Sequence, residues 1–217
     1  MAAIPELHVL LAYTVACAVL FITPGPDMSL FLAKTISGGR RAGIAAMSGA
    51  LSGCLIHTTL AGVGLSALLA ASTTAFLVLK VVGALYLLWL AVDAVRNGST
   101  LSIAEGERKP LSFRRTYLVG LGINLTNPKI VLFFVTFLPQ FVASTDPDAA
   151  AKLVFLGLYF VAFSLPLALL MILGAERLIA YLKRQPKVLR LLDYSFAGIF
   201  GLFALKIIAT EAPPVAR

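Results

Sequence analysis

The sequence predicts an all-α membrane protein, a polytopic bundle of six transmembrane helices built as two inverted three-helix repeats with broken first and fourth helices. Three observations predict this fold: the apolar composition, the placement of basic residues between apolar segments, and two matching breaks. Of the 217 residues, 59% are hydrophobic and only 13% are charged, whereas a soluble domain carries about 25% charged residues. The apolar runs lack the period-two alternation of a membrane β-barrel, so helices are expected.

Six apolar segments are candidates for spans, since a helix needs about 20 residues to cross the hydrocarbon core. They lie at about 7–33, 44–70, 75–95, 117–142, 153–174 and 189–209. Pro24 to Pro26 interrupt the first segment, Asn127-Pro128 interrupts the fourth, and Pro166 lies inside the fifth. Met1 to His8 lacks the basic residues of a signal peptide, so we expect the first segment to stay in the mature protein.

The basic residues predict the orientation of these spans. They cluster in the connections after the first, third and fifth segments: Lys34, Arg40 and Arg41; Arg96, Arg108, Lys109, Arg114 and Arg115; and Arg177, Lys183, Arg184, Lys187 and Arg190. The positive-inside rule places these three connections in the cytoplasm, so both termini are expected outside it. Topology thus explains the net charge of +8. We expect no nucleic-acid partner, because the aromatic residues lie inside the apolar runs.

The two breaks predict the inverted repeat. When the breaks are aligned, Pro26 matches Pro128 and Asp27 matches Lys129. An odd number of spans in each half places the second copy upside down in the membrane, as in many secondary transporters. We therefore expect a single transmembrane domain over 1–217, with repeat one at about 1–96, a cytoplasmic linker at about 97–115 and repeat two at about 116–217.

Each break is expected to expose a helix N-terminus at membrane depth. Thr23 is predicted to cap a half-helix whose first turn is Pro24, Gly25 and Pro26, and Asn127 to cap a helix that begins at Pro128. Free N–H groups at such a terminus favour an anion such as a carboxylate, and the carbonyls that lose their partners upstream can accept from an ammonium group.

Charged residues inside the spans are candidate site residues, because a lone charge at the membrane centre costs about 2.5–3.5 kcal/mol. Asp27 is expected either to bind substrate or a proton, or to satisfy the N–H groups of its half-helix. Lys129 either belongs to the site or forms an ion pair with Asp27 that joins the two halves. Lys80 either faces the site or extends outward to the interface. His57, a second candidate for proton coupling, is either a proton relay or a hydrogen-bonded interior residue.

Small and polar residues complete the pattern. Asn124 shares a helix face with Asn127, toward the break. Gly49 and Gly53 continue with His57 at a helical spacing of four, and such glycines allow close helix packing, either within the chain or in a homodimer.

Signals for enzymatic chemistry are missing from the sequence. Cys17 and Cys54 lie in apolar segments without a ligand pattern around them. No zinc spacing, phosphate-binding loop or Ser-His-Asp set occurs. We expect no enzyme, no catalytic residue, no metal and no cofactor.

Three motifs resemble the LysE/RhtB superfamily of amino-acid exporters. They are Thr23-Pro24-Gly25-Pro26, Leu79–Leu87 and Asn124–Lys129, in that order along the chain. The resemblance covers nearly the whole chain. It implies a LysE family translocator of about six spans in the cytoplasmic (inner) membrane of a bacterium, which moves amino acids or their derivatives outward, in exchange for protons. The expected partners are therefore an amino-acid substrate, protons and the lipid bilayer.

The site is expected between the two broken helices. The predicted substrate-binding and translocation residues are Thr23, Pro24, Gly25, Pro26, Asp27, Lys80, Asn124, Asn127, Pro128 and Lys129, with Asp27 and His57 as the candidates for proton coupling. The chief alternative is a membrane channel or pore for small zwitterionic solutes. A membrane enzyme or an assembly scaffold are further alternatives, but an enzyme needs a reactive set that is not visible, and a scaffold needs no intramembrane breaks of opposite charge.

Overall fold

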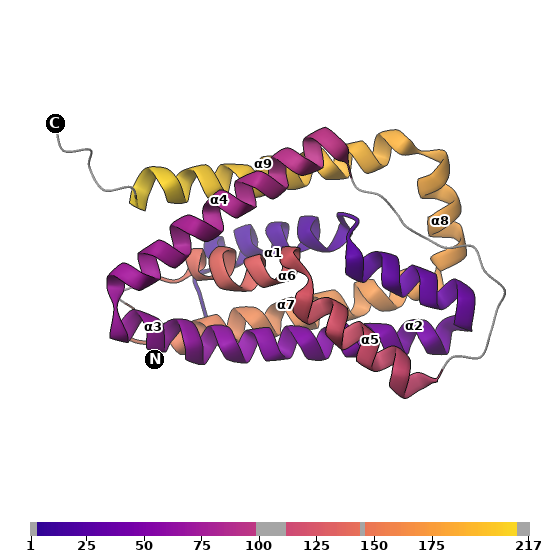
Figure 1. Cartoon of the computed structure of the whole chain (residues 1–217), viewed down its shortest axis with the longest axis horizontal. Helices are drawn as coiled ribbons and strands as arrows, with labels where there is room; N and C mark the ends of the chain where they lie inside the picture. Colours follow the sequence, from indigo (N-terminus) through magenta and orange to yellow (C-terminus); the bar gives the residue numbers. More distant parts are fainter. Residues whose placement is uncertain (1–3, 99–111, 144–145, 212–217) are drawn as a thin grey trace.

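The computed structural model describes residues 4–98, 112–143 and 146–211, and within these ranges the chain forms helices joined by short connections. The prediction of an all-α bundle is confirmed for this part of the chain. The helices pack into an elongated bundle whose long elements run roughly along one axis (Figure 1).

The first half begins with α1 (Leu7–Ile22) and α2 (Pro26–Leu60). A straight helix of the length of α2 would extend about 50 Å, far more than the hydrocarbon core of about 30 Å. Gly39 interrupts it with φ 75° and ψ 177°, a conformation that favours glycine. The chain turns back there (Figure 1). The first predicted span therefore corresponds to α1 and Pro26–Gly38, and extends beyond its predicted end at residue 33.

The second half begins with a similar broken element, formed by α5 (Phe113–Thr126) and α6 (Pro128–Leu132). A π-helical segment η2 (Phe133–Phe137) and a 3-10 turn η3 (Leu138–Phe141) continue α6. The two parts of this element meet at 53°. In Figure 1 the chain runs from left to right through α1 and the start of α2, but from right to left through α5 and α6.

The remaining elements complete the bundle. They are η1 (Ala61–Leu65), α3 (Ser66–Ala71), α4 (Thr73–Asn97), α7 (Ala149–Leu173), α8 (Ala175–Arg184) and α9 (Pro186–Glu211). Helices α4 and α9 lie side by side along one edge of the bundle, while α7 packs against α2 (Figure 1). Pro166 is accommodated inside α7 without ending the helix.

The number of spans is defined only partly by helix length. Among the described residues, four helical stretches are long and apolar enough to cross a membrane, and a fifth is obtained when α5 and the bent segment after it count as one span. Helix α1 has 16 residues, fewer than the about 20 that a span needs. Six spans result only if α1 and the start of α2 form one broken span, as the sequence predicts.

Glycines bring α2 and α5 into backbone contact. A Cβ atom at Gly49 would lie 2.0 Å from the Tyr117 carbonyl oxygen, and one at Gly120 would lie 2.1 Å from the Ala46 carbonyl oxygen. Close packing of this kind excludes any larger side chain. Gly49 therefore packs within the chain, and the prediction of a homodimer loses the support that this residue gave it.

A phenylalanine cluster fills the centre of the bundle and holds the segment after the second break. Phe133 packs against Phe160 of α7 with ring centroids 4.9 Å apart, and Phe137 packs against Phe200 of α9 at 4.7 Å. The rings of Phe133, Phe137 and Phe200 are fully buried. Contacts with both α7 and α9 fix η2 in the interior, and η2 in turn holds the short helix α6 that begins at Pro128.

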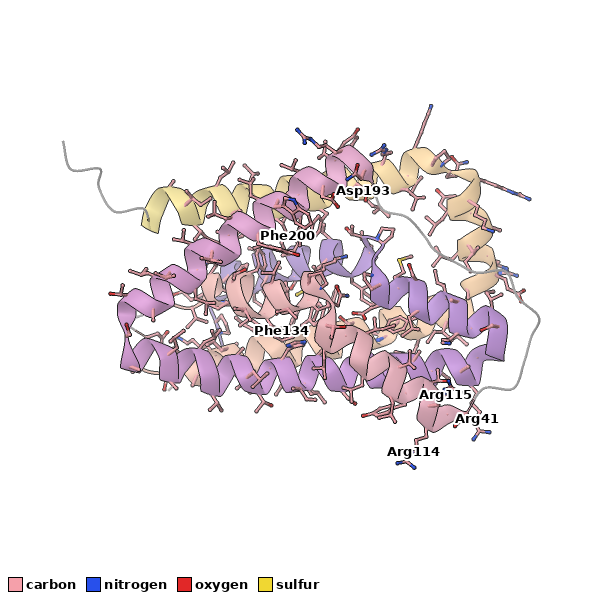
Figure 2. The ribbon with its side chains drawn as sticks, in the orientation of Figure 1. Arg41, Arg114, Arg115, Phe134, Asp193 and Phe200 are labelled. Atoms are coloured by element: carbon pink, nitrogen blue, oxygen red, sulfur yellow. The ribbon has the colours of Figure 1, made fainter. Side chains whose placement is uncertain are left out.

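Basic residues gather at one end of the bundle. Figure 2 shows Arg41, Arg114 and Arg115 at the end where α2 turns back and α5 begins. Helix α8, which carries Lys183 and Arg184, lies at this end as well (Figure 1). Helix α1 begins and α9 ends at the opposite end. Most of the predicted linker, residues 99–111, lies outside the described residues.

Candidate functional site

At the first break, α1 ends at Ile22 and Thr23 closes its last turn. The Thr23 amide and hydroxyl both donate to the Val19 carbonyl, at 3.0 and 2.6 Å. Helix α2 begins three residues later, with Gly25 in the N-cap position and Pro26 at the first helical position. The prediction that Thr23 caps this helix, with Pro24, Gly25 and Pro26 as its first turn, was wrong.

The two prolines explain the error. A proline disfavours helical angles in the residue before it, and both Thr23 and Gly25 precede a proline. Both are extended, with ψ 123° at Thr23 and −175° at Gly25. Only the second proline can therefore occupy the first turn, and α2 begins at Pro26.

The second break follows the prediction. Asn127 is extended (φ −70°, ψ 109°), its side-chain oxygen accepts from the Lys129 amide at 3.1 Å, and Pro128 occupies the first helical position. The prediction that Asn127 caps a helix beginning at Pro128 is confirmed. An asparagine cap satisfies one of the N–H groups that a helix start leaves without a partner.

Side chains from the second break bind groups of the first. The side-chain amides of Asn124 and Asn127 donate to Asp27 Oδ2, at 2.8 and 3.2 Å. Lys129 Nζ donates to the Thr23 carbonyl at 2.7 Å, next to the end of α1. The breaks therefore meet, and each satisfies polar groups that the other presents.

Asp27 and Lys129 lie close together but form no direct ion pair among the described residues. The hydrogen-bond donors to the Asp27 carboxylate are the two asparagine amides rather than backbone N–H groups of α2. The Lys129 ammonium donates a hydrogen bond to the Thr23 carbonyl and lies 5.4 Å from the ring centroid of Phe196. At this distance an aromatic face attracts a cation. The carboxylate and the ammonium thus remain two separate groups.

Both charges line a cavity at the meeting point of the breaks, which we call the central cavity. Its volume is about 60 Å³. Asp27 and Lys129 are the charged members of its described lining, and Met28, Phe31 and Met171 belong to its apolar wall. The full described lining is Leu20, Phe21, Thr23, Gly25, Asp27, Met28, Phe31, Ala50, Leu51, Cys54, Asn124, Asn127, Lys129, Ile130, Phe160, Ser164, Ala168 and Met171.

Two buried polar atoms in this lining have no partner among the described residues: Oδ1 of Asp27 and the hydroxyl of Ser164. Buried polar atoms are nearly always hydrogen-bonded in proteins, so each such atom calls for an explanation. A small polar solute in the central cavity would supply partners for both.

A second cavity, the flanking cavity, lies across the breaks from the first and has a volume of about 390 Å³. Pro24, Pro26 and Pro128 line it together with residues of α4 and α9, among them Asp93 and Phe196. Thr23, Gly25, Asn127 and Lys129 line both cavities. The two breaks therefore form the partition between the cavities.

The structure brings together nine of the ten predicted binding residues, because Lys80 alone lines neither cavity. Lys80 lies on α4. His57, the other candidate for proton coupling, is buried beside the Phe134 ring, with centroids 5.5 Å apart, and lines neither cavity. Its Nε2 atom has no hydrogen-bond partner among the described residues.

Two members of the cavity lining are not among the predicted site residues: Ser164 and Cys54, whose thiol contacts the Asn124 side chain (Sγ to Oδ1 3.7 Å). The sequence does carry a signal for Ser164. A hydroxyl two residues before a proline, deep in an apolar span, is a polar group that needs a partner inside the bundle. Cys54 carries no such signal, because a thiol in an apolar helix is an ordinary interior residue.

Comparisons with known proteins place this chain among membrane translocators. A family profile described as LysE type translocator matches residues 18–211. A homoserine/homoserine lactone efflux protein of Salmonella typhimurium is 31% identical over 194 residues, which cover 88% of this chain and 91% of that protein.

Two further relatives match over nearly their whole length. A leucine efflux protein of Klebsiella pneumoniae is 28% identical over 208 residues, covering 93% of this chain and 95% of that protein. An uncharacterized membrane protein of Vibrio cholerae is 30% identical over 198 residues, with 90% and 94% covered. No solved structure matches this chain.

Proposed function

The chain belongs to the LysE type translocator family, and we propose that it is a secondary transporter that exports amino acids or amino-acid derivatives across the cytoplasmic membrane of a bacterium. The Salmonella and Klebsiella relatives are named as efflux proteins, which supports export. The observation that carries the proposal is the central cavity, where two broken helices present one carboxylate and one ammonium.

The substrate binds between the breaks. Its α-ammonium group lies against Asp27, whose Oδ1 atom is free to accept, and its α-carboxylate lies against Lys129. Asn124 and Asn127 hold the Asp27 carboxylate in place through its other oxygen. An amino acid is a zwitterion, so one site of each sign satisfies both of its charged groups.

Export proceeds by alternating access at the breaks. The two broken elements run in opposite directions (Figure 1), which supports the inverted repeat of the prediction and its rocking motion about a shared site. Lys129 lines both the central and the flanking cavity, so a small movement of either break would pass its ammonium from one to the other. The basic end of the bundle faces the cytoplasm.

Protons drive the export. The Asp27 carboxylate binds either a proton or the substrate ammonium, so the two compete for it. A carboxylate at membrane depth is the type of group that transporters use for proton relays. His57 is the second candidate, because its Nε2 atom has no hydrogen-bond partner in the described part of the chain. Proton influx at Asp27 then accompanies amino-acid efflux, and the protein is an antiporter. Lys80 keeps its predicted role in translocation only if α4 moves toward the site.

Reconstituted vesicles test the proposal. We expect purified protein in proteoliposomes to exchange external labelled amino acid against a saturating internal pool, and an imposed proton gradient to drive net movement. Asp27→Asn should abolish proton-driven export, at least about 100-fold, because the amide cannot take up a proton or hold the substrate ammonium. Lys187→Met, at an exposed lysine of α9, is the control for expression and insertion.

Counterflow distinguishes the transporter from a pore. A pore for small zwitterionic solutes would conduct without saturation and without exchange, so linear flux with no counterflow would contradict the transporter. Full proton-driven efflux by a correctly inserted Asp27→Asn variant would remove the coupling role of Asp27. Saturable exchange that ignores the proton gradient would retain the exporter and reject the antiport.

A further inference from the structure

We infer that Ser164 is a specificity-determining residue, and that the central cavity takes small neutral amino acids whose side chain carries a hydrogen-bonding group such as a hydroxyl. This inference rests on the proposed export function and names the class of substrate within it. Three features of the described residues carry it: the unpartnered Ser164 hydroxyl, the charges of the cavity and its size.

Among the described residues, Ser164 has the only fully buried hydroxyl oxygen without a hydrogen-bond partner. It is 2% exposed and has no hydrogen-bond partner among the described residues. Several other helical hydroxyls donate to the carbonyl four residues earlier, as at Thr58 (2.8 Å to Cys54) and Thr136 (2.8 Å to Leu132). This local bond is the usual way in which a helix satisfies a buried hydroxyl. Ser164 lacks this local bond, although the Phe160 carbonyl lies four residues earlier in the same helix.

Ser164 lies where its hydroxyl can contact a substrate in the central cavity. It lines the central cavity from α7, whereas Asp27 and Lys129 line it from α2 and α6. A substrate held by its ammonium and carboxylate on the two breaks leaves its side chain to meet the third wall. On that wall Ser164 is the hydroxyl, among Phe160, Ala168 and Met171.

The charges of the cavity exclude charged side chains. The described lining contains one carboxylate and one ammonium, and the α-ammonium and α-carboxylate of the substrate use both. A substrate with a basic or acidic side chain would bury a third charge without a counter-charge, which is strongly unfavourable. The cavity therefore selects against amino acids such as lysine and glutamate.

The size of the cavity favours short side chains. Its volume is about 60 Å³, and one water needs about 10–15 Å³ by the same measure. Bulky residues such as Phe31, Phe160 and Met171 surround it. A large aromatic substrate would have to displace these side chains much further than a substrate whose side chain has two or three heavy atoms.

Isosteric substrate pairs test this inference. The probes are L-homoserine against L-norvaline and L-threonine against L-valine, where the members of each pair differ by a hydroxyl in place of a methyl. Half-saturating concentrations for counterflow are measured in proteoliposomes of the wild type and of Ser164→Ala. We expect the wild type to prefer the hydroxylated member at least about tenfold, since a buried group left unpaired by the wrong substrate is costly.

Ser164→Ala should reduce that preference to about twofold or less, mainly by weakening the hydroxylated substrate. Ser164→Thr keeps a hydroxyl and should keep the preference. Ser37→Ala is the matched control, because its hydroxyl donates to the Ala33 carbonyl at 2.8 Å outside the cavity. Excess lysine and glutamate should not compete.

The outcomes separate the two proposals. A wild type that exchanges no amino acid overturns export, and this inference with it. A wild type that exchanges amino acids without preferring the hydroxylated members overturns this inference alone, whatever the variants do, as does effective competition by lysine. A Ser164→Ala variant that weakens both members equally also overturns it, because Ser164 would then hold the backbone of the substrate.

Discussion

The two breaks leave their first helix in almost the same way but begin the second helix differently. Thr23 has φ −69° and ψ 123°, Asn127 has φ −70° and ψ 109°, and each is followed by a proline. Asn127 then caps its own helix. At the first break α2 begins only at Pro26, and Gly25 gives it no side-chain cap. The two breaks thus share the backbone conformation that ends the first helix but differ in the polar groups that begin the second.

The difference divides the polar groups between the breaks. The first break presents acceptors, which are the Asp27 carboxylate and the Thr23 carbonyl. The second break presents donors, which are the amide of Asn127 and the ammonium of Lys129. Neither break is a site alone, because each satisfies the other. Two identical breaks would have placed acceptors against acceptors, or donors against donors, at the centre of the bundle.

Lys129→Met should have the largest effect on this complementarity. The change removes the donor to the Thr23 carbonyl and the only described cation in the central cavity. Hydrogen bonds to charged groups contribute about 1.5–3 kcal/mol, and the substrate carboxylate loses its partner as well. We expect export to fall at least about 100-fold, measured as counterflow in proteoliposomes.

Lys187→Met is again the control for insertion in that experiment. A Lys129→Met variant that exchanges amino acids at the wild-type rate would show that the ammonium only joins the two breaks. The donor and acceptor division would then describe the stability of the bundle and not its transport.

Much of the fold follows from residue types alone. The apolar runs, the basic connections and the prolines are local signals, and they predict the helices and the positions of both breaks. The cap at Asn127 follows as well, because one asparagine precedes one proline. The cap at Thr23 fails, because two prolines constrain three residues together and the last proline decides where the helix begins.

The site is harder to predict than the fold. Lys80 and Lys129 both lie in apolar segments, and the break before Lys129 is the only local signal that distinguishes them. Lys129 follows a break that the phenylalanine cluster holds in the interior, whereas Lys80 lies on α4, away from both cavities. Ser164 comes from a third helix whose rotation no local pattern gives. Residues meet in a cavity through packing between distant segments, and a single sequence carries little information about that packing.

Asn127→Ala should have the next largest effect, on stability. It removes both the helix cap, worth about 1 kcal/mol, and a hydrogen bond to a carboxylate, worth about 1.5–3 kcal/mol. We expect a loss of about 2.5–4 kcal/mol, seen as a lower Tm of the purified protein in detergent. Asn127→Asp keeps a good cap but places a second carboxylate beside Asp27. If Asn127→Asp matched the wild type in both Tm and export, the Asn127 amide would not matter to Asp27.

Thr23→Val should have a much smaller effect than Asn127→Ala, although both residues end a helix before a proline. The Thr23 hydroxyl only donates to the Val19 carbonyl at 2.6 Å, within its own helix, and the same carbonyl already accepts from the Thr23 amide. Valine has nearly the same shape. We expect a loss below about 1 kcal/mol, measured as Tm in parallel with Asn127→Ala. Equal losses in the two variants would mean that Thr23 supports the first break as strongly as Asn127 supports the second.

Gly25→Ala should have the smallest effect, and it tests why the first break contains a glycine. Gly25 has φ −172°, extended backbone that any residue adopts. A Cβ atom there would lie 3.7 Å from Cδ and Nζ of Lys129, an ordinary contact. We expect Tm to change by an amount equivalent to less than about 0.5 kcal/mol and counterflow to stay within about twofold.

Gly120→Ala, with its Cβ atom 2.1 Å from the Ala46 carbonyl oxygen, is the disruptive counterpart. A Gly25→Ala variant with unchanged Tm but little exchange would show that the first break needs glycine for a second conformation, and that the breaks differ in movement as well as in charge.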